Sequence, residues 1–190
     1  TADTTVSLRL AQTLTDTKAA TRCRLVTALA AKSDYPNLIP LLTSLAHDRN
    51  HCVREVSIVA LSRLRAPGAA DLLVAELEQA WAQGHAVDEL CRAMRTLKEK
   101  RALPLLLQIV ESDDIAAVHA ATEALGSIGG ADTAKALRST WRAWSHQHRE
   151  RQYRQVFGQA LAENGETDTV RFLIELAAAQ TDLLIQIEML

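Results

Sequence analysis

Apolar and polar positions alternate along this chain with the period of an α-helix. In residues 53–64, the small or apolar positions that share one helical face are Val53, Val56, Ser57, Ala60, Leu61 and Leu64. Spacings of three and four residues indicate one face of a helix, whereas a half-buried strand alternates every second residue. Comparable stretches run from residues 21, 86, 117 and 153. Each of the five is predicted to be a helix.

A two-residue motif, a small residue followed by a large apolar one, lies at the same place in each stretch. It reads Ala28-Leu29, Ala60-Leu61, Ala93-Met94, Ala124-Leu125 and Ala160-Leu161, at spacings of 32, 33, 31 and 36 residues. Such a period is typical of stacked helix pairs, because one pair is too small to bury its own apolar face. We predict that the second residue of each motif is buried between repeats.

The other helix of each pair and the turns can also be predicted. Pro40 and Pro104 lie 64 residues apart, which is two repeats, and each is expected in the first turn of a helix, where proline removes no hydrogen bond. Helix ends are expected at Pro67-Gly68, Gly129-Gly130 and Gly165, and a break within the third pair at Gly84. The prediction is an all-α, right-handed α-solenoid of stacked antiparallel helix pairs. It forms one domain, 1–190, with approximate units 1–34, 35–67, 68–99, 100–129, 130–165 and a partial unit 166–190.

The cysteines and the apolar runs indicate the cellular location of the protein. The three cysteines, Cys23, Cys52 and Cys91, are widely spaced, each in or beside the second helix of a unit and among apolar neighbours. We expect free thiols that act as small core residues, and therefore a reducing, cytoplasmic location. No apolar run reaches the roughly 18 to 20 residues that span a bilayer, so no membrane partner is expected.

The second helices resemble those of the HEAT-repeat superfamily, and more narrowly its short bacterial form, the phycobilisome-lyase-type repeat. That helix typically reads Val-Arg-x-x-Ala-Ala-x-Ala-Leu-Gly-x-Ile-Gly. Its first half is matched by Val53-Arg54 with Ala60-Leu61, and its second half by residues 120–129, Ala-Ala-Thr-Glu-Ala-Leu-Gly-Ser-Ile-Gly. The resemblance implies that the motif arginine pairs with an aspartate six residues earlier and bridges neighbouring repeats. The two such pairs are Asp16 with Arg22 and Asp48 with Arg54.

The resemblance also implies that the second helices line a concave surface. These helices together carry a positive formal charge, although the whole chain carries −2. A groove of one sign attracts partners of the other, so this face is expected to bind another protein, an acidic one. Its basic residues are Arg22, Arg24, Arg54, Arg63, Arg65, Arg92, Arg95 and Lys98. The alternative is a solvated helix face together with the Asp–Arg bridges.

A second candidate surface lies in the fifth unit, which is about four residues longer than the others. Insertions in repeat proteins often serve binding, and this segment is rich in the residue types that anchor interfaces. The candidate contacts are Trp141, Trp144, His146, His148, Arg149 and Arg151. The alternative is that both tryptophans are core residues of a longer helix.

No catalytic residue, metal site or cofactor is predicted. His47 and His51 flank a turn, and His146 and His148 are two residues apart, which points them to different sides of a helix. Neither pair has a cysteine or carboxylate at a recognised zinc spacing. No Gly-rich phosphate loop or nucleophile motif is present in the sequence.

Three functions are therefore considered. The first is a non-catalytic scaffold that binds a protein on the concave face. The second, implied by the resemblance, is a phycobilin lyase or lyase subunit. The third is nucleic-acid binding, as in alkylpurine glycosylases built from HEAT-like repeats, with Trp81, Trp141 and Trp144 available; the net charge of −2 argues against it.

The last ten residues are predicted to form an unusually apolar helix. Six of the last eight residues are apolar and lie on nearly every side of the helix predicted for 181–190. A terminal repeat needs a polar outer face. We expect this helix to be covered by further repeats, a second copy of the chain or a partner.

Overall fold

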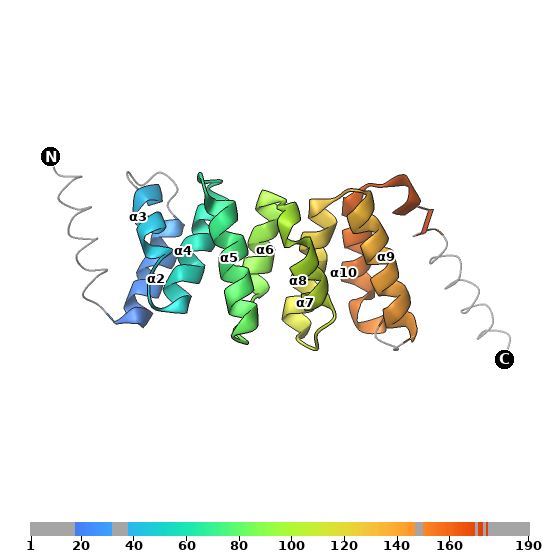
Figure 1. Ribbon diagram of the computed structural model, residues 1–190, viewed down its shortest axis with the longest axis horizontal. Helices are drawn as coiled ribbons and strands as arrows, with labels where there is room; N and C mark the ends of the chain where they lie inside the picture. Colours follow the sequence, from blue (N-terminus) through green and yellow to red (C-terminus); the bar gives the residue numbers. More distant parts are fainter. Residues whose placement is uncertain (1–17, 32–37, 147–149, 170, 173, 175–190) are drawn as a thin grey trace. The chain divides into compact units, whose positions relative to one another are not determined.

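The computed structural model describes residues 18–31, 38–146, 150–169, 171–172 and 174 (Figure 1). Every regular element among these residues is helical and none is a strand, which confirms the all-α class. The chain divides into two compact units, residues 1–97 and 98–190, and each is described by itself. The right-handed sense of the solenoid and the single domain stay predictions. Asp16 and the segment 181–190 lie outside the described residues.

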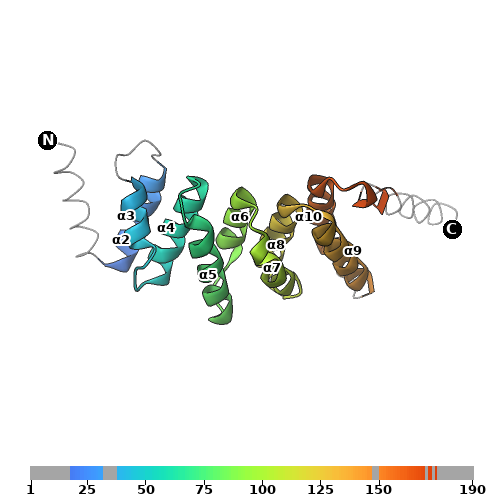
Figure 2. The same cartoon turned by 45° about the horizontal axis from the view of Figure 1, so that its top comes forward.

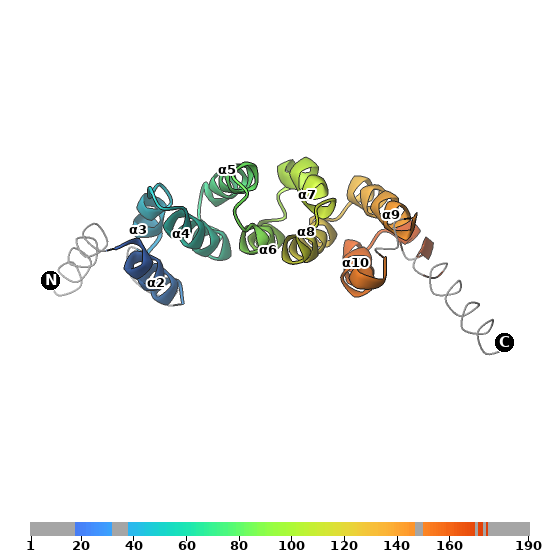
Figure 3. The ribbon, with the colours of Figure 1, turned by 90° about the horizontal axis from the view of Figure 1, so that it is seen from below.

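The first unit contains five described helices in two layers. They are α2 (Ala19–Ala30), α3 (Leu38–Leu45), α4 (His51–Arg63), α5 (Ala69–Ala82) and α6 (Asp88–Leu97). The second helices of successive pairs pack on one another, since α4 contacts both α2 and α6. Helices α3 and α5 pack on α4 and lie on the other side of the unit (Figure 3). This is the predicted stacking of helix pairs.

The second unit repeats the arrangement. A short 3-10 turn, η1 (Lys100–Ala102), leads into α7 (Leu103–Val110), followed by α8 (Ile115–Ile128), α9 (Ala131–His146) and α10 (Glu150–Asn164). Pro104 lies in the first turn of α7, as predicted. Helices α8 and α10 pack on each other, with α7 on α8 and α9 on α10 (Figure 2). With 16 residues, α9 is the longest described helix, so the extra residues of the fifth unit extend its first helix.

The repeated motif supplies the core of both units. Leu61, Met94, Leu125 and Leu161 are all buried, as predicted. The prediction is wrong for Leu29, which is only half-buried, and Val26 is the buried residue of α2 instead. The residue of α2 that faces the neighbouring helix α4 most fully is therefore Val26, one turn before Leu29.

Four second helices are followed by a residue with a positive φ at the same place. The residue five positions after the motif alanine has a positive φ in each case: 50° at Arg65, 53° at Lys98, 69° at Gly129 and 75° at Gly165. A left-handed residue at this point allows the last carbonyls of a helix to be satisfied by the following backbone. The two glycine stops were predicted. At Arg65 and Lys98 a residue with a long side chain has the positive φ, and no glycine occupies these positions.

Gly126 lies at a point where the backbones of α8 and α10 are in contact. A Cβ atom added there would be 2.6 Å from Ala160 Cα and 2.7 Å from the Ala160 carbonyl oxygen. Gly126 directly follows the motif Ala124-Leu125, and Ala160 is the first residue of the motif in the next repeat. A small residue is therefore required because the backbones themselves are in contact.

The Gly126→Ala variant is expected to lose about 1 to 3 kcal/mol of unfolding free energy, because the new methyl group overlaps the backbone of α10. Gly158→Ala is the matched control. It also lies within a helix, but an added Cβ there has no atom within 4 Å, so it should gain about 0.5 to 1 kcal/mol from the better helix propensity. Urea unfolding of the full chain measures both. Equal effects in the two variants would contradict the proposed contact.

Candidate partner-binding site

Two of the predicted contact arginines hold neighbouring repeats together. Arg22 on α2 donates through Nε and Nη2 to the two carboxylate oxygens of Asp48, at 3.0 and 2.8 Å. Arg54 on α4 donates through Nε and Nη2 to Glu76 on α5, at 2.8 and 3.0 Å. Both pairs are bidentate, the geometry that makes arginine–carboxylate contacts strong and specific. These two guanidinium groups therefore act in the structure of the repeats.

Arginines do bridge neighbouring repeats, as the resemblance implies, but the expected pairing of Asp48 with Arg54 is wrong. Asp48 pairs with Arg22 of the preceding unit, and Arg54 contacts only the carbonyl oxygen of Asp48, at 3.2 Å. The partner of Arg54 is Glu76 of the following unit, whose side chain is 4% exposed. Burial by itself raises the pKa of Asp48, but the hydrogen bonds from Arg22 and from the Asn50 backbone outweigh it and lower the pKa.

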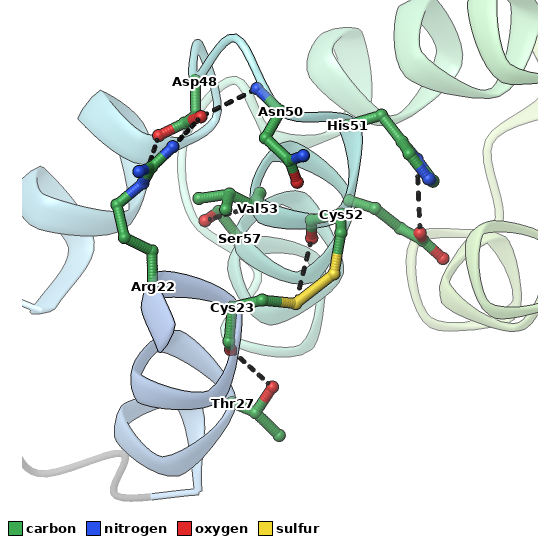
Figure 4. The surroundings of a disulfide bond; sticks show 10 residues. Arg22, Cys23, Thr27, Asp48, Asn50, His51, Cys52, Val53 and Ser57 are labelled. Atoms are coloured by element: carbon green, nitrogen blue, oxygen red, sulfur yellow. Dashed lines mark hydrogen bonds and ion pairs between the residues drawn. A yellow bond between two sulfur atoms is a disulfide. The ribbon is translucent and has the colours of Figure 1, made fainter. Parts of the chain in front are cut away.

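A disulfide also joins α2 to α4. Cys23 and Cys52 are bonded, and their Cα atoms are 6.2 Å apart (Figure 4). The expectation of free thiols is wrong for these two, because stacking brings together residues 29 positions apart in the sequence. Disulfides persist in oxidising compartments, so the argument for a cytosolic location from free thiols no longer holds. Cys91 is buried in α6.

Two other basic residues of the first unit, Arg63 and Arg92, lie near carboxylates on an exposed surface. We call this surface, formed by α2, α4 and α6, the second-helix face. Arg63 on α4 is 65% exposed and lies 3.6 Å from Glu89. Arg92 donates to Asp88 and Glu89 of its own helix, at 2.8 and 2.6 Å. Arg95 is exposed on α6. Acidic side chains thus accompany the basic ones that the sequence indicated.

A pocket of about 360 Å³ opens on the second-helix face. The C-terminal part of α2 and the middle of α4 form its walls, which the disulfide and the Arg22–Asp48 pair hold together. Short apolar side chains make up much of its lining: Ala30, Ala31, Val56, Val59 and Ala60. Thr27, Glu55, Arg63 and Glu89 supply the polar part. It is therefore an apolar hollow with charged groups at its edge.

Glu55 is the most perturbed ionisable group of this pocket. Its side chain is only 19% exposed, and within the described part of the chain the basic side chain within 4.0 Å is that of His51, at 3.8 Å. Burial raises the pKa of the Glu55 carboxyl to about 7, and negative charges add to the effect, those of Asp88, Glu89 and Glu76. The carboxylate therefore lies in a region of negative potential.

His51 does not relieve this charge. Its ring stacks on that of His85, with centroids 4.3 Å apart. Burial, and then the charges of His85 and Arg54, lower the pKa of His51. At neutral pH the imidazole is consequently uncharged, and Glu55 has a neutral neighbour.

The aromatic segment of the fifth unit is placed differently from the expected surface. Trp141 and Trp144 are 5% and 2% exposed and pack against Phe157 of α10. Trp144 also packs on Tyr153, at a centroid distance of 4.7 Å. Both indoles are thus interior groups of the second unit. His148 and Arg149 lie outside the described residues, as do the side chains of His146 and Arg151.

Sequence reasoning missed the acidic half of this site. Glu55, Asp88 and Glu89 lie on helices that were assessed by net charge, which conceals carboxylates among arginines. Their positions along the helices held a usable signal, because Glu55 adjoins Val56 and lies one turn before Val59. Which helix would face them was not readable from the sequence.

Comparison with known proteins identifies the repeats. A family model for HEAT repeats matches residues 7–83 and 80–147. No curated protein matches the sequence. Among the described residues, no helix is both long and apolar enough to cross a membrane. In the same part of the chain, no three histidine, cysteine or acidic side chains are grouped to hold a metal ion.

The Arg54–Glu76 pair is buried and the Arg63–Glu89 pair is exposed. Removing the arginine of each pair should therefore change the unfolding free energy of the protein by very different amounts. Arg54→Met leaves the Glu76 carboxylate buried without its partner and should cost about 3 to 5 kcal/mol, whereas Arg63→Met should cost less than about 1 kcal/mol. Chemical denaturation measures both. The double variant Arg54→Met with Glu76→Met should recover most of the loss, since no buried charge remains. A small effect of Arg54→Met would show that the bridge is not structural.

The raised pKa of Glu55 predicts a pH dependence. The folded state binds more protons than the unfolded state between pH 4.5 and about 7, so the Glu55 contribution to stability is present below this interval and is lost as the pH rises through it. Glu55→Gln should therefore be more stable than the wild type at pH 8, by about 1 to 2 kcal/mol after solvent screening, and equal to it near pH 4. The exposed Glu78→Gln on α5 is the control. A constant difference between pH 4 and 8 for Glu55→Gln would be the contrary result.

Proposed function

Because this chain belongs to the HEAT-repeat family, we propose that it is a non-catalytic scaffold that binds another protein through its second-helix face. HEAT repeats generally serve as protein-interaction scaffolds. The observation that carries the proposal for this chain is the pocket between α2 and α4, on the exposed side of the second helices. The helices around it are fixed by a disulfide and by bidentate ion pairs. A rigid surface binds a partner with little loss of conformational entropy.

We also propose that the repeats are of the short bacterial, phycobilisome-lyase type. The close contact of Gly126 with Ala160 supports this, since it gives the Ala-Leu-Gly sequence of that motif a physical reason. One simple observation distinguishes the scaffold function from the lyase function. A visible absorbance band on mixing the chain with a bilin would favour the lyase.

Peptide selection on the full chain tests the scaffold. Short peptides from a random displayed library are selected, and their affinities are measured for the wild type, Thr27→Trp and Thr43→Trp. Thr27 lines the pocket, whereas Thr43 lies on α3. The two threonines are otherwise matched, because both are exposed and each hydroxyl donates to the carbonyl oxygen four residues earlier, at 2.9 Å.

Thr27→Trp should weaken the selected peptides by roughly tenfold or more, because the indole fills the pocket at the centre of the interface. Thr43→Trp should leave them within about twofold of the wild type, as expected for a position outside the interface. If the peptides bound equally to both variants, the interface would not lie on the second-helix face. Salt-dependent binding of duplex DNA as tight as that of the peptides would favour the nucleic-acid function instead.

A further inference from the structure

The charges around the pocket leave one carboxylate without a strong counter-charge. Arg92 is engaged by Asp88 and Glu89 on its own helix. Arg63 lies 3.6 Å from Glu89 and is largely exposed, so water screens its charge. Glu55 has only His51 at ion-pair distance among the described residues. A cation brought to Glu55 would meet a carboxylate that this part of the chain does not neutralise.

The lining of the pocket fits the stem of such a cation. Val56 and Val59 lie one turn apart on α4, and Ala30 and Ala31 lie opposite them at the end of α2. Small apolar side chains leave room for a flexible methylene chain, and long basic side chains bury their methylenes against such surfaces while the charged end stays polar. The hollow and the carboxylate are adjacent, since Glu55 and Val56 are consecutive.

We propose that this pocket receives a lysine or arginine side chain from the partner protein, with its methylenes against Val56 and Val59 and its cation beside Glu55 and Glu89. The proposal rests on the proposed function and adds the chemistry of the partner: a segment that presents one basic residue among apolar ones. Charge complementarity carries it, because two carboxylates, Glu55 and Glu89, line the pocket, whereas the one cation of the lining, Arg63, is 65% exposed and screened by water.

The local potential favours this occupant over an acidic one. The charges that act on Glu55 most strongly are those of Asp88, Glu89 and Glu76, and all three oppose its ionisation. Several positive charges of the second helices are already engaged: Arg22 and Arg54 pair with carboxylates of neighbouring repeats, and Arg92 pairs with Asp88 and Glu89 of its own helix. An acidic side chain in the pocket would add another like charge to this group, whereas a basic one would stabilise the ionised Glu55.

The peptides selected on the full chain provide the probe. They should be enriched in lysine or arginine flanked by apolar residues. Replacing that lysine with norleucine keeps the methylenes and removes the charge. At pH 8, this change should weaken binding to the wild type by roughly tenfold, and to Glu55→Gln by less than about twofold, because the charge it would meet is gone. Glu78→Gln, on α5, should keep the full tenfold effect.

The outcomes separate the two proposals. If Thr27→Trp abolishes peptide binding but lysine and norleucine peptides bind equally, the interface stands and the basic occupant is wrong. The same conclusion follows if the norleucine penalty is unchanged in Glu55→Gln. If no peptide distinguishes Thr27→Trp from Thr43→Trp, the scaffold face itself is wrong, and the inference falls with it. Glu55→Gln retains the fold in this design, since it removes an unfavourable charge.

Discussion

Each unit of this protein depends on the contact between the second helices of neighbouring repeats. One helix pair has too little apolar surface to be stable alone, so stability comes from the stacking of α2 on α4, α4 on α6 and α8 on α10. The contact of α8 with α10 is so close that only a glycine fits at position 126. The motif alanines and leucines are therefore residues of the interface between repeats as much as of the helices themselves.

Ion pairs and a disulfide also connect the first repeats, and they depend on the same stacking of helices. The Arg22–Asp48 and Arg54–Glu76 pairs each connect one repeat to the next, and the disulfide connects the second helices directly. Buried ion pairs contribute less to stability than their short distances suggest, but breaking one partner is costly. Their bidentate geometry fixes the relative position of the repeats, and so it fixes the walls of the pocket between α2 and α4.

The pocket combines features that are unfavourable in an isolated chain. A largely buried carboxylate faces other carboxylates, which raises the pKa of Glu55 and lowers the stability of the fold at neutral pH and above. Unfavourable charges of this kind are typical of functional sites, although structural networks produce them as well. In this protein the bidentate arginine contacts join neighbouring repeats, and the carboxylates of Glu55 and Glu89 line the pocket.

The sequence alone determined the helices, their pairing in repeats and most of the core, because the period of the apolar positions and the glycine stops are local signals. It also indicated that the motif arginines bridge repeats. Only the tertiary structure decided which carboxylate each arginine meets, that Cys23 bonds Cys52, and that Trp141 and Trp144 are interior. These contacts depend on which faces of distant helices come together. Rotating a helix about its axis by the angle of one residue would change the contacts, although the period of the apolar positions would stay the same. The positive φ at Arg65 and Lys98 was not predicted either, because neither position has the glycine that commonly marks such a helix end.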